Sequence, residues 1–426
     1  MQNVVILGGG YAGMAAAFRL VQNGAVKPTI IERAPEIGGL SGSCSIDGQP
    51  IEKFYHHIKP EDRHVLDLAE HLGLADQLVW ADTRMGFYID GQTYGFSTGM
   101  DLLKFRPFRL LDKMRFALGV LRSKRVDGRS LEGISAKEWV IRDWGQTIYD
   151  RMMAPMLLNK FGISPERISA GFLHGRIKGL SSAKKSARNG EQFAYILGSN
   201  QVLAERMTEH LQGKVELRTG AGVDRMEKTE KGFEIWAGGE CTRARWVVNT
   251  LPLHVFERIP KNFDFKTEVE YQGVVCAIFA VKEELSSHYW LNVLDPSITF
   301  RVLVNQSRLA PYQNTVVYCA NYVAADSSLY ACDDDDILSQ YRRDLEQMYG
   351  RVTVVDQVLS RTPNATPIFD RDFADKTAHL DTVAEGMVFA GNVKIYPGSR
   401  TVSSVIGTGY AAADRILAAA QTVAAG

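Results

Sequence analysis

The N-terminal segment, residues 3–20, constrains the fold more than any other part of the sequence. It reads as a short apolar run, a glycine cluster and an alanine-rich stretch, an order that predicts a strand, a tight turn and a helix. Gly8, Gly10 and Gly13 stand in the G-x-G-x-x-G register. In that register the first glycine permits the turn, the second lets a pyrophosphate approach the backbone, and the third lets the helix pack on the strand. The N–H groups that open the helix would point at the phosphates.

A second apolar strand, residues 29–31, ends in Glu32, 19 residues after Gly13. A carboxylate at this point can accept hydrogen bonds from ribose hydroxyls. Arg33 follows it, and because Glu32 would repel a 2′-phosphate we interpret Arg33 as a solvated side chain. A glycine motif alone is a weak signal, but strand, helix, second strand and terminal acid stand here in order. The sequence therefore predicts a Rossmann-type dinucleotide-binding unit.

A second glycine pair, Gly38-Gly39, follows and is succeeded by Leu40 and Ser41. A nicotinamide-binding Rossmann fold does not require this pair. The pattern resembles the extended FAD fingerprint of the superfamily that holds flavin amine oxidases, protoporphyrinogen oxidases, phytoene desaturases and, more distantly, UDP-galactopyranose mutases. Leu40 departs from it, since the superfamily often has a basic residue there.

The resemblance recurs in residues 386–416, where Gly391-Asn392 precedes a helix of small residues that includes Gly407 and Gly409. Small side chains let such a helix approach a cofactor closely. Asn392 replaces the usual acid. Two cradles at opposite ends of the chain favour FAD, and we expect it to be non-covalent because no Cys or His stands in a recognisable linkage motif. The resemblance implies cofactor contacts at Gly8, Gly10, Tyr11, Ala12, Gly13, Glu32, Arg33, Gly38, Gly39, Leu40, Ser41, Val223, Gly391, Asn392, Thr401 and Val402.

The resemblance also predicts the organisation of the chain. We expect an α/β fold, α+β overall, in which a Rossmann-type FAD-binding domain is interleaved with a substrate domain of mixed antiparallel sheet and helices. The FAD-binding domain would comprise residues 1–75, 201–260 and 365–426, and the substrate domain residues 76–200 and 261–364. Asp47-Gly48 and Asp90-Gly91 predict two hairpin turns, and Asp333–Asp336 would complement the dipole at a helix start.

Candidate catalytic residues lie in residues 51–62, which contain the pair His56 and His57. The segment is similar to one in UDP-galactopyranose mutases, and closer to that of a protoporphyrinogen-oxidase-like group with a double histidine. A neutral imidazole beside the flavin could donate a hydrogen bond or act as an acid or base, and His57 is our preferred residue. The alternative is a loop that packs under the flavin without a chemical role.

Arginines suggest the character of the substrate, because a guanidinium binds carboxylate or phosphate bidentately. They favour an anionic substrate over a simple amine, and Arg400 also joins the candidate catalytic set. Two tyrosines could line an aromatic wall. The candidate substrate-binding residues are Arg176, Tyr289, Arg301, Tyr318 and Arg361.

The charge balance argues against a polynucleotide partner, since 49 basic and 49 acidic side chains leave no net charge. Five scattered cysteines signal neither a zinc site nor a disulfide framework, and we expect no metal. The absence of a leader or a membrane-spanning run predicts a cytoplasmic protein. Residues 101–129 carry nine basic and three acidic side chains among Phe and Leu. They fit either a solvated helix face or a peripheral contact with the inner face of a membrane.

The leading functional hypothesis is an FAD-dependent oxidoreductase, that is an oxidase, dehydrogenase or desaturase. It would take hydride from a C–H bond of a small or lipid-like substrate onto flavin N5. One alternative is a flavin isomerase like UDP-galactopyranose mutase, acting on a nucleotide sugar. A second is a cofactor-free binding or escort protein on the same scaffold, which the intact glycines and Glu32 disfavour.

Overall fold

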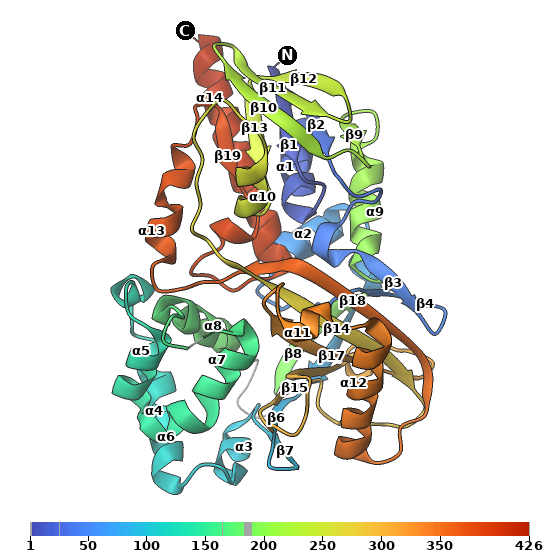
Figure 1. Cartoon of the computed structure of the whole chain (residues 1–426), viewed down its shortest axis with the longest axis vertical. Helices are drawn as coiled ribbons and strands as arrows, with labels where there is room; N and C mark the ends of the chain where they lie inside the picture. The colour runs from blue at the N-terminus through green and yellow to red at the C-terminus, as the bar shows by residue number, and fades with distance from the viewer. Residues whose placement is uncertain (1, 25, 164, 183–189, 426) are drawn as a thin grey trace.

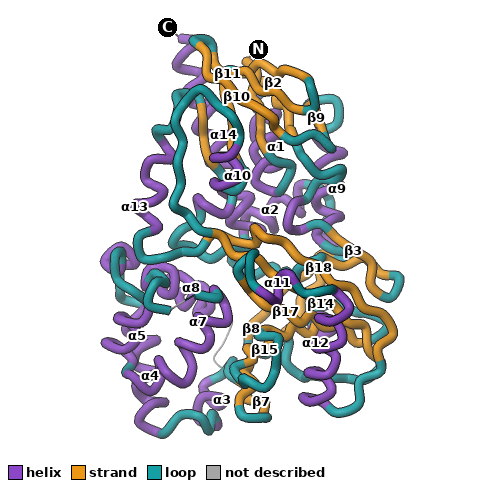
Figure 2. The backbone as a smooth tube through the Cα atoms, viewed as in Figure 1, coloured by secondary structure: helices purple, strands orange, loops and turns teal. Residues whose placement is uncertain are grey.

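The computed structural model describes residues 2–24, 26–163, 165–182 and 190–425. Figure 1 shows two parts stacked along the long axis, with both ends of the chain in the upper part. The lower part is divided into a helical half and a sheet half, which Figure 2 separates by colour. The chain crosses between the upper and lower parts several times.

A parallel sheet forms the centre of the upper part, and its strands come from three separate stretches of the chain. Val4, Val5, Ile6 and Leu7 of its central strand are fully buried, as a parallel sheet covered on both faces requires. The prediction of an interleaved α/β fold is thereby confirmed. Across the sheet the strands are β19 (Met387–Phe389), β13 (Trp246–Asn249), β1 (Gln2–Leu7), β2 (Val26–Ile31) and β9 (Glu216–Arg218).

Different elements cover the two faces of this sheet. Val4 and Ile6 belong to a core formed with helices, and Val5 and Leu7 to a core that includes a small antiparallel sheet. The helices are α1 (Tyr11–Asn23), α2 (Arg63–His71), α9 (Asn200–Leu211) and α14 (Val402–Ala425), and the opposite face has β10 (Val223–Thr229), β11 (Gly232–Ala237), β12 (Glu240–Ala244) and α10 (Leu253–Arg258).

The lower sheet is antiparallel except where β15 pairs with β6. Its strand β14 is apolar along nearly its whole length, because one face packs against a helix and the other against two antiparallel strand pairs. The helix is α12 (Asp334–Tyr349), and the pairs are β3 (Ser43–Ile46) with β4 (Gln49–Glu52) and β5 (Leu78–Thr83) with β8 (Glu191–Ile196). In order the sheet contains β18 (Val354–Pro367), β14 (Tyr271–Val281), β17 (Thr315–Val323), β16 (Val302–Asn305), β15 (Trp290–Val293), β6 (Met85–Ile89) and β7 (Gln92–Gly95).

The local predictions about turns and helix starts are confirmed. Asp47-Gly48 joins β3 to β4 and Asp90-Gly91 joins β6 to β7, and all four residues have positive φ, as type I′ turns require. Three aspartates, Asp334 to Asp336, occupy the first turn of α12. The short helix α11 (Ser328–Ala331) precedes α12, and the short helix α13 (Phe373–Ala378) follows β18.

The helical half packs around aromatic side chains. Trp139 and Trp144 are buried there, and a Cβ on Gly119 would lie 2.4 Å from the Trp144 ring, so the two helices that carry these residues are in close contact. The helices are α3 (Gly99–Lys104), α4 (Leu110–Ser123), α5 (Ala136–Trp144), α6 (Gln146–Ile148), α7 (Ala154–Phe161) and α8 (Ala170–Ser182). Among the described residues we find no helix whose length and apolarity suit a membrane span.

Candidate functional site: a dinucleotide cradle and a cationic cleft

The first glycine cluster forms a turn between β1 and α1 that admits almost no side chains. Gly8 has φ +105°, and a Cβ on it would come within 2.4 Å of the Thr250 hydroxyl. A Cβ on Gly13 would lie 2.0 Å from the Gly8 carbonyl oxygen. Gly10 differs, since its added Cβ would meet nothing closer than Gly39 Cα at 3.9 Å. The space beside Gly10 is therefore open for a ligand.

The second glycine pair lies directly against the first. Gly38 donates its N–H to the Gly9 carbonyl (3.0 Å), and a Cβ on Gly39 would stand 3.2 Å from Gly10 Cα. Gly38 and Gly39 both have positive φ. The short turn that follows contains half-buried Leu40 and buried Ser41.

Glu32 lies at the mouth of this cradle. Its carboxylate accepts hydrogen bonds from the N–H groups of Gly9 (2.7 Å) and Ala34 (2.8 Å), and its remaining lone pairs can accept ribose hydroxyls. Arg33 is exposed beside Gly222. Ala221 donates its N–H to the Glu32 carbonyl (3.1 Å), which brings the start of β10, with Val223, to the same end of the sheet.

The C-terminal glycines complete the cradle from the other end of the chain. A Cβ on Gly409 would lie 2.3 Å from the Ala12 carbonyl oxygen, so α14 and α1 touch through backbone. Gly391, with φ +90°, donates its N–H to the Thr408 hydroxyl (2.9 Å), and half-buried Asn392 follows it. The Tyr11 hydroxyl donates to the Asn200 carbonyl and so ties α1 to α9.

These turns fit an FAD molecule. The N–H groups at the start of α1 and the open space at Gly10 suit a pyrophosphate, and Glu32 suits a ribose. Thr401, just before α14, donates its hydroxyl to Asp62 (3.0 Å). Val402 opens α14. Residues 51–62, which contain both histidines, therefore lie beside the start of α14.

The two histidines are neutral at physiological pH. Burial lowers the pKa of His57 to about 3, with Lys59, His56 and Arg176 contributing, and burial lowers the pKa of His56 to about 4. His57 Nδ1 lies 3.2 Å from the Tyr289 hydroxyl, and its ring stacks on Phe193 at 4.1 Å. His56 Nδ1 is buried and has no hydrogen-bond partner among the described residues. Neutral imidazoles can donate or accept hydrogen bonds here without adding charge.

Three cations gather beyond the histidines: Lys160 on α7, Arg176 on α8 and Arg400 before α14. Burial and the charges of Arg400 and Arg176 lower the pKa of Lys160 well below its usual range. Burial lowers the pKa of Arg400 to about 10, with a contribution from the Arg176 charge. Within the described ranges none of the three forms an ion pair with a carboxylate. They form a cluster of basic groups that no carboxylate of the described residues neutralises.

Aromatic rings rather than carboxylates surround Lys160 and Arg400, and Arg400 also donates a hydrogen bond to the Pro367 carbonyl (3.3 Å). Lys160 Nζ stands 4.1 Å from the centroid of the Tyr322 ring, and the Tyr322 hydroxyl lies 2.9 Å from that of Tyr55. The Arg400 guanidinium lies within 5.2–5.9 Å of three phenylalanine rings. Cation–π contacts of this kind stabilise a charge without cancelling it.

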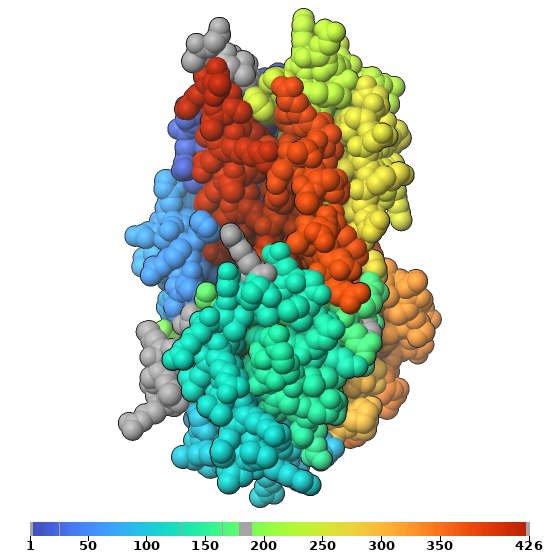
Figure 3. All heavy atoms as spheres, turned by 90° about the vertical axis from the view of Figure 1, so that its left-hand side faces the viewer, coloured from blue at the N-terminus to red at the C-terminus, as the bar shows by residue number. Residues whose placement is uncertain are grey.

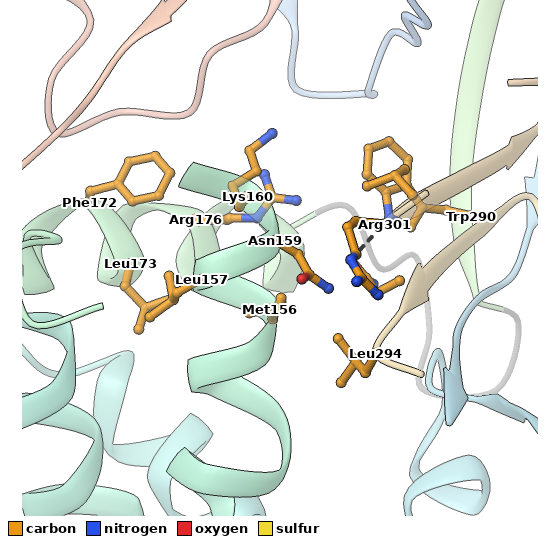
Figure 4. A pocket seen from close by; sticks show the side chains of 12 residues that line it. Met156, Leu157, Asn159, Lys160, Phe172, Leu173, Arg176, Trp290, Leu294 and Arg301 are labelled. Carbon is orange, nitrogen blue, oxygen red and sulfur yellow. Dashed lines mark hydrogen bonds between the residues drawn. The ribbon is translucent and has the colours of Figure 1, made fainter. Parts of the chain in front are cut away.

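Two members of this cluster, Lys160 and Arg176, line a small cleft between the helical half and the lower sheet. Figure 4 shows Lys160 and Arg176 together on the helical side and Arg301 on the sheet side, near Trp290. Arg301 donates to the Asp295 carbonyl (3.0 Å). Two predicted substrate residues, Arg176 and Arg301, thus line one cleft, and Arg400 belongs to the adjoining cluster.

The structure does not bring the other predicted substrate residues to the cleft lining. Tyr289 and Tyr318 are fully buried in the sheet, where Tyr289 meets His57 and Tyr318 donates its hydroxyl to the Glu52 carbonyl (2.8 Å). Arg361 is ion-paired with Asp334. Sequence reasoning also missed Lys160, whose only signal is a single basic residue between Asn159 and Phe161.

Glu52, at the end of β4, is a second residue that sequence reasoning missed. It is fully buried and accepts hydrogen bonds from the Tyr195 hydroxyl (2.7 Å) and the Asn200 N–H (2.7 Å). It therefore connects the sheet of the lower part to α9 of the upper part. Burial raises the pKa of Glu52 to about 7.

Glu52→Gln is expected to change how stability depends on pH. Because the folded pKa lies above the unfolded value of about 4.3, the folded state binds more protons between these limits, and the free energy of unfolding falls as pH rises through them. The substitution removes this fall. The free energy of unfolding of the variant, taken relative to wild type, therefore rises by about 2–3 kcal/mol between pH 5 and pH 8. Urea unfolding at pH 5 and at pH 8 measures this difference in the free energy of unfolding. The control is Glu70→Gln, because Glu70 is exposed. Equal differences at the two pH values would contradict the expectation.

Together the fold and the cradle define a dinucleotide-binding flavoprotein with an interleaved second part. The family model described as "Flavin containing amine oxidoreductase" matches residues 11–417. The chain belongs to this family, and its cofactor is FAD. The glycine patterns predicted membership of the flavin amine oxidase superfamily, and this prediction is confirmed.

Individual relatives are distant. A Mycobacterium tuberculosis protein named "Putative flavin-containing monoamine oxidase AofH" is 25% identical over 282 residues, which are 63% of this chain and 61% of the relative. The match thus spans about three fifths of that relative. A solved structure titled "Putative protoporphyrinogen oxidase" from Exiguobacterium sp. 255-15 superposes with TM-score 0.80 at 18% identity, covering 97% of this chain and 98% of the other. A reduced UDP-galactopyranose mutase gives TM-score 0.78 at 16% identity, covering 98% and 96%. These two likenesses show the fold.

Proposed function

We propose that this protein is an FAD-dependent oxidoreductase that takes hydride from a C–H bond of a small anionic molecule onto flavin N5. The observation that carries the anionic character is the cluster of Lys160, Arg176 and Arg400, which no described carboxylate neutralises. FAD, when bound, supplies the hydride acceptor. The role of the protein is to bind and orient the substrate carbon.

Buried charge explains why an anion fits this cleft. A guanidinium group that is partly removed from water and has no carboxylate partner costs free energy, and the repulsion between Arg176 and Arg400 adds to that cost. A carboxylate or phosphate group would relieve both costs by accepting charge-assisted hydrogen bonds from the guanidinium groups. An ammonium group would be repelled by the two guanidinium charges. The cluster therefore favours a carboxylated or phosphorylated substrate over a simple amine.

His57 is proposed as a neutral hydrogen-bonding group on the cofactor side of the cleft. Its Nδ1 is oriented by the Tyr289 hydroxyl and its ring by Phe193, so Nε2 is the nitrogen available to substrate or cofactor. Its pKa of about 3 means that it would not become a cation at neutral pH. A hydrogen bond to a developing charge, rather than storage of a proton, is the role that this environment supports.

Anaerobic mixing of the FAD-loaded protein with paired substrates tests the proposal. Each pair would consist of an oxidisable compound with a carboxylate or phosphate group and a neutral or amine analogue with the same reacting C–H bond. We expect the flavin absorbance to bleach with the anionic member and to recover when an electron acceptor is admitted. Bleaching by the amine members alone would contradict the anionic substrate class while leaving the cofactor assignment intact.

A further inference from the structure

Helix α4 is apolar on two faces, although only one of them is covered. The inner face packs into the helical core, where the Phe116 ring lies 5.2 Å from the Trp144 ring and Gly119 lets the helix approach it. A helix of a soluble domain normally presents a polar surface opposite its core face. The outer face of α4 instead presents apolar side chains.

Exposed apolar side chains form a stripe along the outer face of α4 and continue onto α3. Of the twelve large apolar side chains that are exposed in the described chain, seven fall between Met100 and Leu121. All seven are between 49% and 69% exposed. Such a concentration on one surface marks an interaction site more often than chance. We call this surface the α3–α4 stripe: Met100, Leu103, Leu110, Leu111, Met114, Leu118 and Leu121.

Basic side chains surround the stripe, and their charges are not balanced. Two of the three nearby acids serve the helix starts, because Asp101 accepts the N–H groups of Ser97 and Thr98 and Asp112 accepts that of Arg109. In the described part of the chain none of the exposed basic residues around the stripe is a partner in a salt bridge. They are Lys104, Arg106, Arg109, Arg115, Arg122, Lys124 and Arg125.

We propose that the α3–α4 stripe docks on an anionic lipid surface. Apolar side chains flanked by Lys and Arg have the chemistry of an interfacial helix, which places its apolar face among acyl chains and its cations among phosphate headgroups. In Figure 3 the helices of residues 99–161 form the lower part of one face of the molecule, so the surface faces outward. A second copy of this chain fits less well, since a two-fold contact would place the same basic rim against itself.

Sedimentation with lipid vesicles tests the proposal on the FAD-loaded protein. We expect binding to vesicles of phosphatidylglycerol and phosphatidylcholine, and little binding to phosphatidylcholine alone. Each basic side chain near an anionic surface contributes about fivefold to partitioning, so Lys104→Gln/Arg122→Gln is expected to weaken binding about 25-fold. High salt should weaken it as well.

A second variant isolates the apolar contribution. Leu111→Gln, Met114→Gln, Leu118→Gln and Leu121→Gln together keep helix propensity and are expected to abolish binding at any lipid composition. The matched control is Arg342→Gln/Arg343→Gln, which removes two exposed arginines of α12 and should bind like wild type. The flavin spectrum of every variant reports correct folding independently of lipid.

Three results would overturn the proposal. One is no sedimentation with anionic vesicles at low salt. Another is binding that the charge variant and the apolar variant leave unchanged. The third is a dimer in light scattering that the apolar variant dissociates while vesicles bind neither form, which would assign the stripe to a second copy instead.

Discussion

Gly10→Ala is expected to weaken FAD binding while leaving the protein folded. A Cβ at this position would meet no protein atom closer than 3.9 Å, so the polypeptide itself tolerates it. The methyl group would instead fill the space where the backbone admits a pyrophosphate. Overpacking of this kind costs about 1–3 kcal/mol, which corresponds to a loss of about 5- to 150-fold in FAD affinity. Titration of the apoprotein with FAD, followed by flavin fluorescence, measures it.

Two further glycine variants separate cofactor binding from folding. Gly13→Ala places a Cβ 2.0 Å from the Gly8 carbonyl, so this variant should lose thermal stability as well as FAD. Gly99→Ala, where an added Cβ meets nothing within 4 Å, should resemble wild type in both. If the Gly10 variant retained normal FAD affinity, the pyrophosphate could not lie at this turn.

Removal of either arginine of the cationic cluster, Arg176 or Arg400, is expected to raise KM for an anionic substrate far more than it lowers kcat. Charge-assisted hydrogen bonds are worth about 1.5–3 kcal/mol each, so Arg176→Gln or Arg400→Gln should raise KM about 10- to 150-fold. Ground-state and transition-state binding would be lost together, because the anionic group is remote from the reacting carbon. Steady-state kinetics with the substrate found by the bleaching screen measure both parameters.

The control for this experiment is an arginine outside the cleft. Arg342 is exposed and paired with Glu346 on α12, so Arg342→Gln should leave KM unchanged. Inorganic phosphate offers a readout without turnover, as it should inhibit wild type competitively and the two cleft variants more weakly. An unchanged KM in both cleft variants would remove the cluster from the substrate-binding site.

The features that could be predicted from the sequence depend on neighbouring residues. A strand, a glycine turn and a helix follow one another within residues 3–20, and an Asp-Gly pair suffices for a hairpin turn. The cofactor cradle, the two hairpins and the acidic start of α12 can therefore be predicted from the sequence. The cationic cluster is different, since Lys160 and Arg400 stand 240 positions apart and only the tertiary fold brings them together.

Arg361 shows why side-chain direction was the hardest feature to predict. It lies opposite Val275 in the pairing of β18 with β14, and Val275 faces the core on the α12 side. Because successive residues of a strand point to opposite faces, a shift of one position would have reversed its direction. The sequence of β18 is rich in polar residues and carries too weak an alternation to decide between the two faces.

The contact between α1 and α14 has a consequence for how the protein is made. The parallel sheet needs β19, and the cradle needs Gly391 and Gly409, all of which leave the ribosome after the whole lower part. The glycine turn at the start of the chain therefore stays incomplete during most of synthesis, and β13, which pairs with β1 on one side, lacks its other neighbour until β19 has been made. Chains built from such distant contacts fold slowly and benefit from chaperones. Loading of the cofactor is accordingly an event that follows translation.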